Sequence, residues 1–352
     1  GFTACEGSDD GEKPGPNGEI KAPYTISVDK NEIEADGKDA ANFILTDANG
    51  NVLTENEQLN YIVFENTATG NQLDKKTSAF TAVKNGTYTF KALYKNKPSE
   101  NTVTVTAKNR SAYEKYFRKV AAYDITNVNC GYCPLMASAL ENTAAEWKQH
   151  MTVFAIHGPY DLQDPYIIGS VANNLLSKYI GSGSYPSAIF NLDYTMTGAG
   201  DAKPAFIAGV IEDQLRTNPA TCGIRINSSY ADKTITINAG LTSSTGGKYD
   251  IGYAVLLNNG TYVGGTASDN KYDDIVVGLS GNYMAMSENA FTVAANEEHT
   301  GATTFELKED IAGNLSNYRV AVFALRNNGS KIIIDNVAEC SLGGSVDYKV
   351  NE

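Results

Sequence analysis

The tetrapeptide Cys130-Gly131-Tyr132-Cys133 is the part of this sequence in which a reaction can be read most directly. Two thiols separated by two residues can close a disulfide and open it again. Pro134 and an apolar pattern with helical spacing follow at once. On the first turn of a helix, unpaired backbone N–H groups and the positive end of the helix dipole stabilise a thiolate. We therefore predict that Cys130 is a nucleophile and that Cys133 is its resolving partner.

Asp124 and the dipeptide Tyr185-Pro186 could assist the two thiols. Asp124 lies on an expected strand that leads to Cys130. A buried carboxyl there is costly unless it has partners or a task, and beneath a dithiol it can relay a proton to the resolving thiol. The alternative is an ordinary hydrogen-bonded aspartate at a strand end. A cis bond before Pro186 would bring a backbone edge against the sulfurs and leave Tyr185 free to pair with an extended substrate.

A Cys-x-x-Cys pair is also half of many zinc sites. Tetrahedral zinc needs four ligands, and the sequence has no second such pair, while His150, His157 and His299 are scattered. We predict neither a metal nor another cofactor.

The pattern around these residues changes twice along the chain. Strands alternate with helices between residues 111 and 218, which is typical of βαβ units on a central sheet. Before and after this region, β-branched and aromatic residues form short strands separated by turn residues, as in β-sandwiches. The segments expected to be strands in the two flanking regions are 24–28, 41–46, 59–64, 87–94, 102–106, 233–238, 251–257, 318–325 and 331–335.

The composition limits the possible functions. A chain of 352 residues is long enough for two or three domains. The 28 Lys and Arg residues against 41 Asp and Glu residues give a net charge of -13, which repels phosphate backbones, so we predict no nucleic-acid partner. The sequence has no run of eighteen apolar residues, so we predict no transmembrane helix in it.

The first residues point to a membrane anchor of another kind. Phe2-Thr3-Ala4-Cys5 resembles the end of a bacterial lipoprotein signal, and an acidic, glycine-rich stretch at 6–18 follows it as a tether. We predict a lipid on Cys5; a plain disordered terminus is the alternative. With five cysteines in all, Cys222 and Cys340 then either form a second disulfide or remain separate buried thiols.

The strand with Asp124, the sequence Cys130 to Pro134, the following helix and strand, and Tyr185-Pro186 together resemble the thioredoxin fold. In that family the first cysteine attacks, the second resolves, a buried acid assists proton transfer and a cis-proline loop contacts the partner. The resemblance gives these roles to Cys130, Cys133, Asp124 and Pro186, with Tyr185, Gly131 and Tyr132 as further substrate contacts. One position departs from many thioredoxins, because Asn129 stands where they place a tryptophan.

The whole layout resembles the outer-membrane-protein-twenty-eight-related lipoproteins of Bacteroidetes. It implies a multidomain α+β protein of the outer membrane, in which a thioredoxin-like α/β domain is flanked by an N-terminal immunoglobulin-like β-sandwich and a C-terminal β-sandwich. The segment 27–39 resembles the opening of bacterial immunoglobulin-like modules. The expected parts are a lipoprotein N-terminus and tether at 1–21, an immunoglobulin-like domain at 22–108, a thioredoxin-like domain at 109–219 and a β-sandwich at 220–352.

Two functions are open at this point. The first is a membrane-tethered thiol–disulfide oxidoreductase that acts on protein thiols or disulfides of the cell envelope. The second is a non-catalytic surface lipoprotein, in which the tetrapeptide forms a structural disulfide and the β domains bind a glycan or a protein partner. A disulfide that closes so few residues removes little chain entropy, which favours the first. Asn129, the bulky Tyr185 and the two large β regions favour the second.

Overall fold

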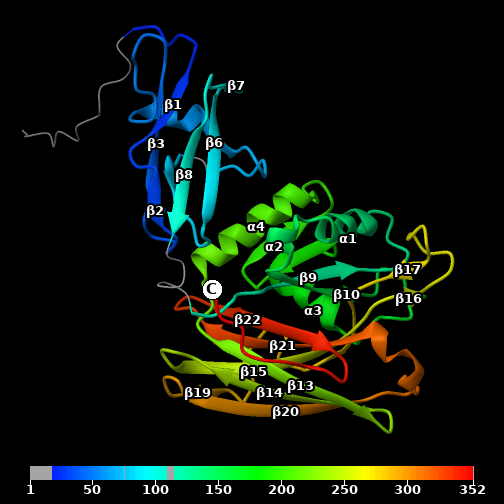
Figure 1. Ribbon diagram of the computed structural model, residues 1–352. Coiled ribbons are helices and arrows are strands. Elements are labelled where there is room, and N and C mark those ends of the chain that lie inside the picture. The colour runs from blue at the N-terminus through cyan, green and yellow to red at the C-terminus, as the bar shows by residue number, and fades with distance from the viewer. Residues whose placement is uncertain (1–17, 75, 109–114, 352) are drawn as a thin grey trace, which may run out of the picture. The chain divides into compact units, whose positions relative to one another are not determined.

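The computed structural model describes residues 18–74, 76–108 and 115–351. The chain divides into two compact units, Gly1–Asn109 and Arg110–Glu352 (Figure 1). Each unit has its own hydrophobic core or cores. Cys5 and the rest of the first seventeen residues lie outside the described residues, so the predicted lipidation site has no structural description.

The first unit consists of two β-sheets on one core. Residues alternate between buried and exposed along strand β3 (Ala41–Thr46), where Phe43 and Leu45 point inward. The Phe43 ring lies 5.1 Å from the ring of Phe64 and 4.8 Å from that of Phe90, so aromatic contacts join the two sheets. One sheet has the order β1-β3-β5 and the other β2-β8-β6-β4, with β7 on β6. The remaining elements are β1 (Thr25–Val28), β2 (Glu32–Glu34), η1 (Glu57–Tyr61), β4 (Ile62–Asn66), β5 (Ala79–Phe80), β6 (Gly86–Tyr94), β7 (Lys97–Pro98) and β8 (Val103–Lys108).

The second unit is built on a nine-stranded mixed sheet. Its order is β12-β11-β9-β10-β18-β15-β21-β22, and β19 pairs with β15. Strand β9 (Val120–Thr126), which carries Asp124, is buried along its whole length between β10 and β11. The other strands of this sheet are β10 (Met151–His157), β11 (Ser187–Phe190), β12 (Tyr194–Thr197), β15 (Gly247–Leu257), β18 (Ile275–Leu279), β19 (Phe291–Val293), β21 (Tyr318–Asn327) and β22 (Ile332–Ser341).

The predicted fold class is wrong. Strands make up 41% of the structure and helices 15%, and the described residues do not show a central thioredoxin-like α/β domain flanked by a separate C-terminal sandwich. Instead, β10 pairs in parallel with β18, where Ala155 lies opposite Ile275. The two regions that were expected to be separate therefore share one sheet and one hydrophobic core. The physical reason lies in β10, which is buried and pairs with β9 along one edge only. Without β18, the backbone N–H and C=O groups of its other edge would have no partners.

Strands β15, β21 and β22 of this sheet pack against a second sheet. That sheet has four strands in the order β20-β14-β13-β23. Residues of both sheets, among them Ile237, Tyr253 and Val322, form one core. Figure 1 shows β13, β14 and β20 as a layer beside β15 and β21. The strands of this second sheet are β13 (Gly223–Ala231), β14 (Thr234–Thr242), β20 (Glu298–Glu306) and β23 (Ser345–Val346). The unit also contains the strand pair β16 (Gly260–Thr261) and β17 (Lys271–Tyr272) and the short helix η4 (Ala312–Asn317).

Helices cover the part of the nine-stranded sheet around β9 and β10 on both faces. Helix α1 (Cys133–Glu141) and helix α4 (Pro204–Thr217) contact each other and β9. Buried residues recur on α4 at helical spacing, which gives it the apolar stripe of a helix on a sheet. On the other face, residues of α3 (Val171–Leu175) and η3 (Leu176–Ile180) join Tyr123 and Ile125 in the core. The short helix α2 (Ala145–Lys148) buries Trp147.

Candidate functional site

Cys130 and Cys133 form a disulfide at the start of α1. The helix begins at Cys133, and Cys130 precedes it by one turn, in which the Cys133 N–H donates to the Cys130 carbonyl at 3.4 Å. Each cysteine is only 2% exposed, whereas Tyr132 at the tip of the turn is 70% exposed. The tip of the loop is therefore far more accessible than either cysteine.

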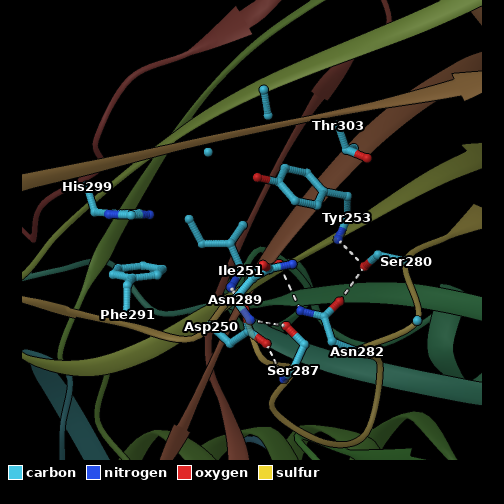
Figure 2. Close-up of a pocket in the computed structure, with 13 residues that line it drawn as sticks. Asp250, Ile251, Tyr253, Ser280, Asn282, Ser287, Asn289, Phe291, His299 and Thr303 are labelled. Atoms are coloured by element: carbon cyan, nitrogen blue, oxygen red, sulfur yellow. Dashed lines mark hydrogen bonds between the residues drawn. The ribbon is translucent and has the colours of Figure 1, made fainter.

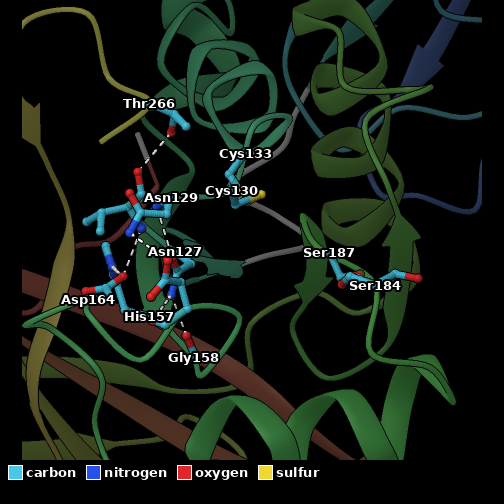
Figure 3. Close-up of a disulfide and its surroundings, with 12 residues drawn as sticks. Asn127, Asn129, Cys130, Cys133, His157, Gly158, Asp164, Ser184, Ser187 and Thr266 are labelled. Atoms are coloured by element: carbon cyan, nitrogen blue, oxygen red, sulfur yellow. Dashed lines mark hydrogen bonds and ion pairs between the residues drawn. A yellow bond between two sulfur atoms is a disulfide. The ribbon is translucent and has the colours of Figure 1, made fainter. Parts of the chain in front are cut away.

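A network of asparagines fixes the chain just before Cys130 (Figure 3). The Asn127 side chain donates to the carbonyls of Gly158 and Asp161 at 2.8 and 2.9 Å, and its oxygen accepts from the Asn129 N–H at 2.9 Å. The Cys130 N–H in turn donates to the Asn127 carbonyl at 3.1 Å. Asn129, the position that departs from thioredoxins, therefore takes part in holding the loop.

The segment between β15 and β18 supports the same loop from the C-terminal part of the chain. The Val128 carbonyl accepts three hydrogen bonds: from the Thr266 N–H at 2.8 Å, from the Thr266 hydroxyl at 3.1 Å and from the Tyr272 hydroxyl at 3.1 Å. Sequence reasoning missed Thr266 and Tyr272, because nothing in a single sequence links them to a motif so far away. The cysteine loop is therefore held by both halves of the second unit.

A buried His–Asp pair anchors the other side of the loop. His157 Nδ1 lies 2.7 Å from Asp164 Oδ2, and both side chains are almost fully buried. Asp164 also accepts from the N–H groups of Val128 and Tyr166 at 2.9 and 2.8 Å. Burial acts to raise the pKa of Asp164, but the hydrogen bonds from His157 and the backbone outweigh it, so this pKa is lowered. Asp164 is therefore ionised and acts as a fixed acceptor.

Asp124 and Cys133 line one cavity of about 590 Å³. Asp124 stands in the middle of the sheet, opposite Ala155 on β10 and Ala188 on β11, and it is 2% exposed. Its Oδ1 atom has no hydrogen-bond partner among the described residues. Burial, followed by repulsion from Asp274, raises the pKa of Asp124 to about 7. This carboxyl can therefore release and take up a proton near neutral pH.

The rest of the cavity wall comes from the end of β9, from α1, from β10 and from the segment before β18. Asp274 forms an ion pair with Arg319, yet burial raises its pKa. Glu141 and Lys271 also line the cavity. Acidic side chains thus outnumber basic ones around Asp124, which adds to the cost of ionising it. Asp274 is a second functional candidate that the sequence pattern did not reveal.

Tyr185 and Pro186 lie apart from this cavity. The bond between them is cis, and Ser187, the next residue, pairs with Ile125, so Pro186 lies beside the end of β9 from which the cysteine loop departs. The Tyr185 ring lies 5.4 Å from that of Tyr160, and burial raises its pKa to about 12. Figure 3 places Ser184 and Ser187 on the side of the disulfide opposite Asn129.

The two other cysteines of the described residues do not pair. Cys222 and Cys340 are both free, so the second disulfide left open by the sequence is absent from the structure. Cys222 is buried and its thiol donates to Asp335 Oδ2 at 3.1 Å. Burial and the Asp335 carboxylate raise the pKa of Cys222 well above its usual value. The thiol of Cys222 is therefore unreactive in the folded protein.

Within residues 18–74, 76–108 and 115–351, no three or more His, Cys, Asp or Glu side chains are arranged to hold a metal ion. No helix in the part of the chain that the structure describes is long and apolar enough to cross a membrane.

Comparison with known proteins adds a fold likeness. No family model matches the chain, and no curated protein matches it. Among solved structures, HBP35 of Porphyromonas gingivalis is 18% identical and superposes with a TM-score of 0.53, over 65% of this chain and 76% of HBP35. A domain of the outer membrane lipoprotein Omp28 from Porphyromonas gingivalis is 12% identical, with a TM-score of 0.23 over 35% of this chain and 89% of that domain. The likeness to HBP35 shows a shared fold.

Proposed function

We propose that this protein is a thiol–disulfide oxidoreductase of the bacterial cell envelope, tethered by a lipid on Cys5. The observation that carries the proposal is the Asp124 carboxyl, which is buried, has an unpaired oxygen and a pKa of about 7, and lines the same cavity as Cys133. A disulfide with a purely structural role has no use for a neighbouring carboxyl of this kind, because burying it lowers stability.

The reaction has two steps. In the reduced protein, the Cys130 thiolate attacks one sulfur of a substrate disulfide, forms a mixed disulfide and releases the other substrate sulfur as a thiolate. The Asp124 carboxylate then accepts the proton of the Cys133 thiol, and the Cys133 thiolate attacks the Cys130 sulfur. This attack releases the second substrate thiolate and leaves the Cys130–Cys133 disulfide. An external dithiol reductant of the envelope returns the two electrons.

The proposed substrates are disulfides of envelope proteins. Tyr132 and Gly131 are exposed at the tip of the cysteine loop, where a protein partner meets them first. Tyr185 and Pro186, beside the end of β9, are proposed as the second contact. The segment Phe2 to Cys5, which resembles the end of a lipoprotein signal, and the tether at 6–18 support an outer-membrane location.

One observation favours the second candidate, a structural disulfide in a non-catalytic surface lipoprotein. Both cysteines are 2% exposed, and hydrogen bonds hold the loop that precedes them: Asn127 accepts from the Asn129 N–H, and Thr266 and Tyr272 donate to the Val128 carbonyl. A substrate disulfide can reach Cys130 only when the loop moves. The two candidates therefore differ in whether this loop opens.

The reduction potential and trapping of partners separate the two candidates. For a redox-active pair we expect a potential above about −300 mV, the value below which structural disulfides of secreted proteins lie. A Cys133→Ser variant should accumulate mixed disulfides with envelope proteins, and the matched Cys130→Ser variant should accumulate far fewer. A potential below this range, together with no trapped partner, would show that the disulfide is structural.

The role of Asp124 has its own test. We expect Asp124→Asn to slow the release of a model mixed disulfide from Cys130 by about a hundredfold at neutral pH, because the proton acceptor is lost. The Cys222→Ser variant, which changes a buried thiol outside the cavity, should react at the rate of the unchanged protein. Equal rates for Asp124→Asn and the unchanged protein would remove Asp124 from the mechanism.

A further inference from the structure

The second unit has another pocket, of about 380 Å³ (Figure 2). Its walls come from β15, β20, β19 and the loop that follows β18. It shares no lining residue with the cavity beside Cys133. The volume is within the roughly 300–1,000 Å³ typical of small-molecule sites. Its chemistry is therefore independent of the dithiol.

Tyr253 presents an unpaired hydroxyl to this pocket. Tyr253 is 7% exposed, and the hydroxyl has no hydrogen-bond partner among the described residues, although its backbone N–H donates to Ser280 at 2.8 Å. Burial, with a contribution from Asp250, raises the pKa of Tyr253 to about 12, so the hydroxyl keeps its proton and can donate. A Cβ atom at Gly301 would lie 2.5 Å from this hydroxyl, so the glycine leaves space for it. Because Tyr253 lines the pocket, a ligand bound there can complete the hydrogen bonding of this hydroxyl.

The opposite wall is apolar and flat. The rings of Phe291 and His299 are stacked, with centroids 3.4 Å apart and an angle of 11° between their planes. Ile251 lies between this ring pair and Tyr253 in Figure 2. Stacked rings and an aliphatic side chain offer a surface on which C–H groups pack.

Internal hydrogen bonds hold the loop after β18 in place. Asn282 donates to the Ile251 carbonyl at 2.9 Å and accepts from the Ser280 hydroxyl at 2.6 Å, while the Ser287 N–H donates to Asp250 Oδ2 at 2.6 Å. These groups are occupied and shape the pocket. A pocket formed in advance lowers the entropy cost of binding.

Two further polar side chains stay free for a ligand. The side chains of Asn289 and Thr303 line the pocket and have no hydrogen-bond partner among the described residues. Together with Tyr253 they supply amide and hydroxyl groups that both donate and accept. No Lys or Arg of the described chain lines the pocket, and Asp250 is its acidic group. The site is therefore unsuited to phosphate, sulfate or carboxylate groups.

We propose that this pocket binds a neutral carbohydrate, as a single sugar residue or the end of a short glycan. A sugar ring presents C–H groups on a face, which fit the wall of Phe291, His299 and Ile251, and hydroxyls at its rim, which fit Tyr253, Asn289 and Thr303. Each sugar hydroxyl donates and accepts, as these three side chains require. The proposal does not depend on the redox function.

The test is binding of defined sugars to the full-length protein. We would measure saturation-transfer NMR and calorimetry with glucose, galactose, mannose, N-acetylglucosamine and their common disaccharides, and with glucuronic and N-acetylneuraminic acids as anionic probes. We expect at least one neutral sugar to bind with a millimolar or lower Kd, and the anionic probes to bind more weakly. Absence of binding by every neutral sugar in the millimolar range, or preference for an anionic probe, overturns the proposal.

Two variants locate the binding. Tyr253→Phe removes one hydroxyl and keeps the ring, and it should weaken binding about tenfold. The matched variant Tyr230→Phe, which removes a hydroxyl bonded to Asp310 outside the pocket, should leave Kd unchanged. Gly301→Ala, which places a methyl group beside Tyr253, should reduce binding further. Binding that survives Tyr253→Phe unchanged in a protein of normal melting temperature contradicts this site. A Cys130→Ser, Cys133→Ser double variant should bind the sugar normally, which separates this result from the redox function.

Discussion

The second unit contains two buried aspartates, one bonded to a cysteine thiol and one that shares a cavity wall with a cysteine, and their surroundings differ. Asp335 beside Cys222 is fully buried and has many partners. It accepts hydrogen bonds from the N–H group and the hydroxyl of Thr221 and from the N–H group and the thiol of Cys222. It also forms an ion pair with Arg326. Asp124, in the cavity wall with Cys133, is equally buried but has an unpaired oxygen.

This difference separates a structural carboxyl from a reactive one. A carboxylate that accepts several hydrogen bonds and pairs with an arginine, as Asp335 does, stabilises the fold around it. A carboxyl that burial has left without partners has a pKa near neutrality and can exchange a proton with a neighbour. Two buried aspartates of one unit thus differ in how readily they can exchange a proton.

The largest expected effect is a change in pH dependence caused by Asp124→Asn. The pKa of Asp124 is raised from 3.8 in the unfolded chain to about 7 in the folded protein, so the folded state holds this proton more tightly. The contribution of protonated Asp124 to the free energy of unfolding is therefore fully present below about pH 4 and is lost as the pH rises through 7. The loss is on the order of 4 kcal/mol. Chemical denaturation between pH 4 and pH 8 should show this loss in the unchanged protein and a smaller one in the variant. Parallel curves for the two proteins would mean that Asp124 is already ionised.

Asp335→Asn should act in the opposite direction. The change removes the charge that pairs with Arg326 and weakens the bonds from Thr221 and Cys222. We expect a loss of about 3 kcal/mol in the free energy of unfolding at neutral pH, where Asp124→Asn is stabilising. Urea titrations of both variants at pH 8 measure this contrast. If both variants shift the midpoint in the same direction, the distinction between the two carboxyls is wrong.

A smaller effect is expected for Cys222→Ala. The variant leaves a small void in the core and removes one donor to Asp335, which should cost about 1 kcal/mol. The reduction potential of the Cys130–Cys133 pair should stay the same, since Cys222 lies outside the cavity. Thermal unfolding and glutathione titration of the same sample test both parts; a shifted potential would show coupling between the two cysteine sites.

The smallest expected effect on stability belongs to Tyr132→Ala. Tyr132 is 70% exposed and makes the tip of the cysteine loop, so its removal should change the free energy of unfolding by less than about 0.5 kcal/mol. The rate of reaction with protein disulfides should fall, while the rate with a small-molecule disulfide should remain. Stopped-flow kinetics with both kinds of substrate distinguish these cases, and equal rates with protein disulfides would exclude Tyr132 as a contact.

The sequence predicted single elements better than their arrangement. The strand with Asp124 and the helix after Cys133 were visible because their apolar residues follow a clear period. Strand β20, in which Thr, Gly and His take most positions, has no clear apolar period and was missed. Strand β18 was missed as well, although its five residues form a short apolar run rich in Ile and Val. Without β18, the region around Asp124 reads as a separate α/β domain, which is the source of the wrong fold class.

The candidate site was predicted in part for the same reason. The Cys-x-x-Cys spacing and the aspartate on the preceding strand are local features, so Cys130, Cys133 and Asp124 could be named from the sequence. Asp274, Thr266 and Tyr272 reach the site only through the pairing of β10 with β18. The Asp124 pKa depends on that pairing as well, since Asp274 is one of its causes. No local pattern records such long-range neighbours.

The parallel pairing of β10 with β18 also sets the order in which the protein can fold. Ala155 and Ile275, which lie opposite each other, are about 120 residues apart in the chain. Pairing at this separation raises contact order and slows folding, because a long loop must close before the contact forms. Thr266 and Tyr272, which hold the carbonyl before the cysteine loop, arrive with the same late segment. The loop before Cys130 therefore lacks these hydrogen bonds until the segment from Thr266 to Ile275 has folded.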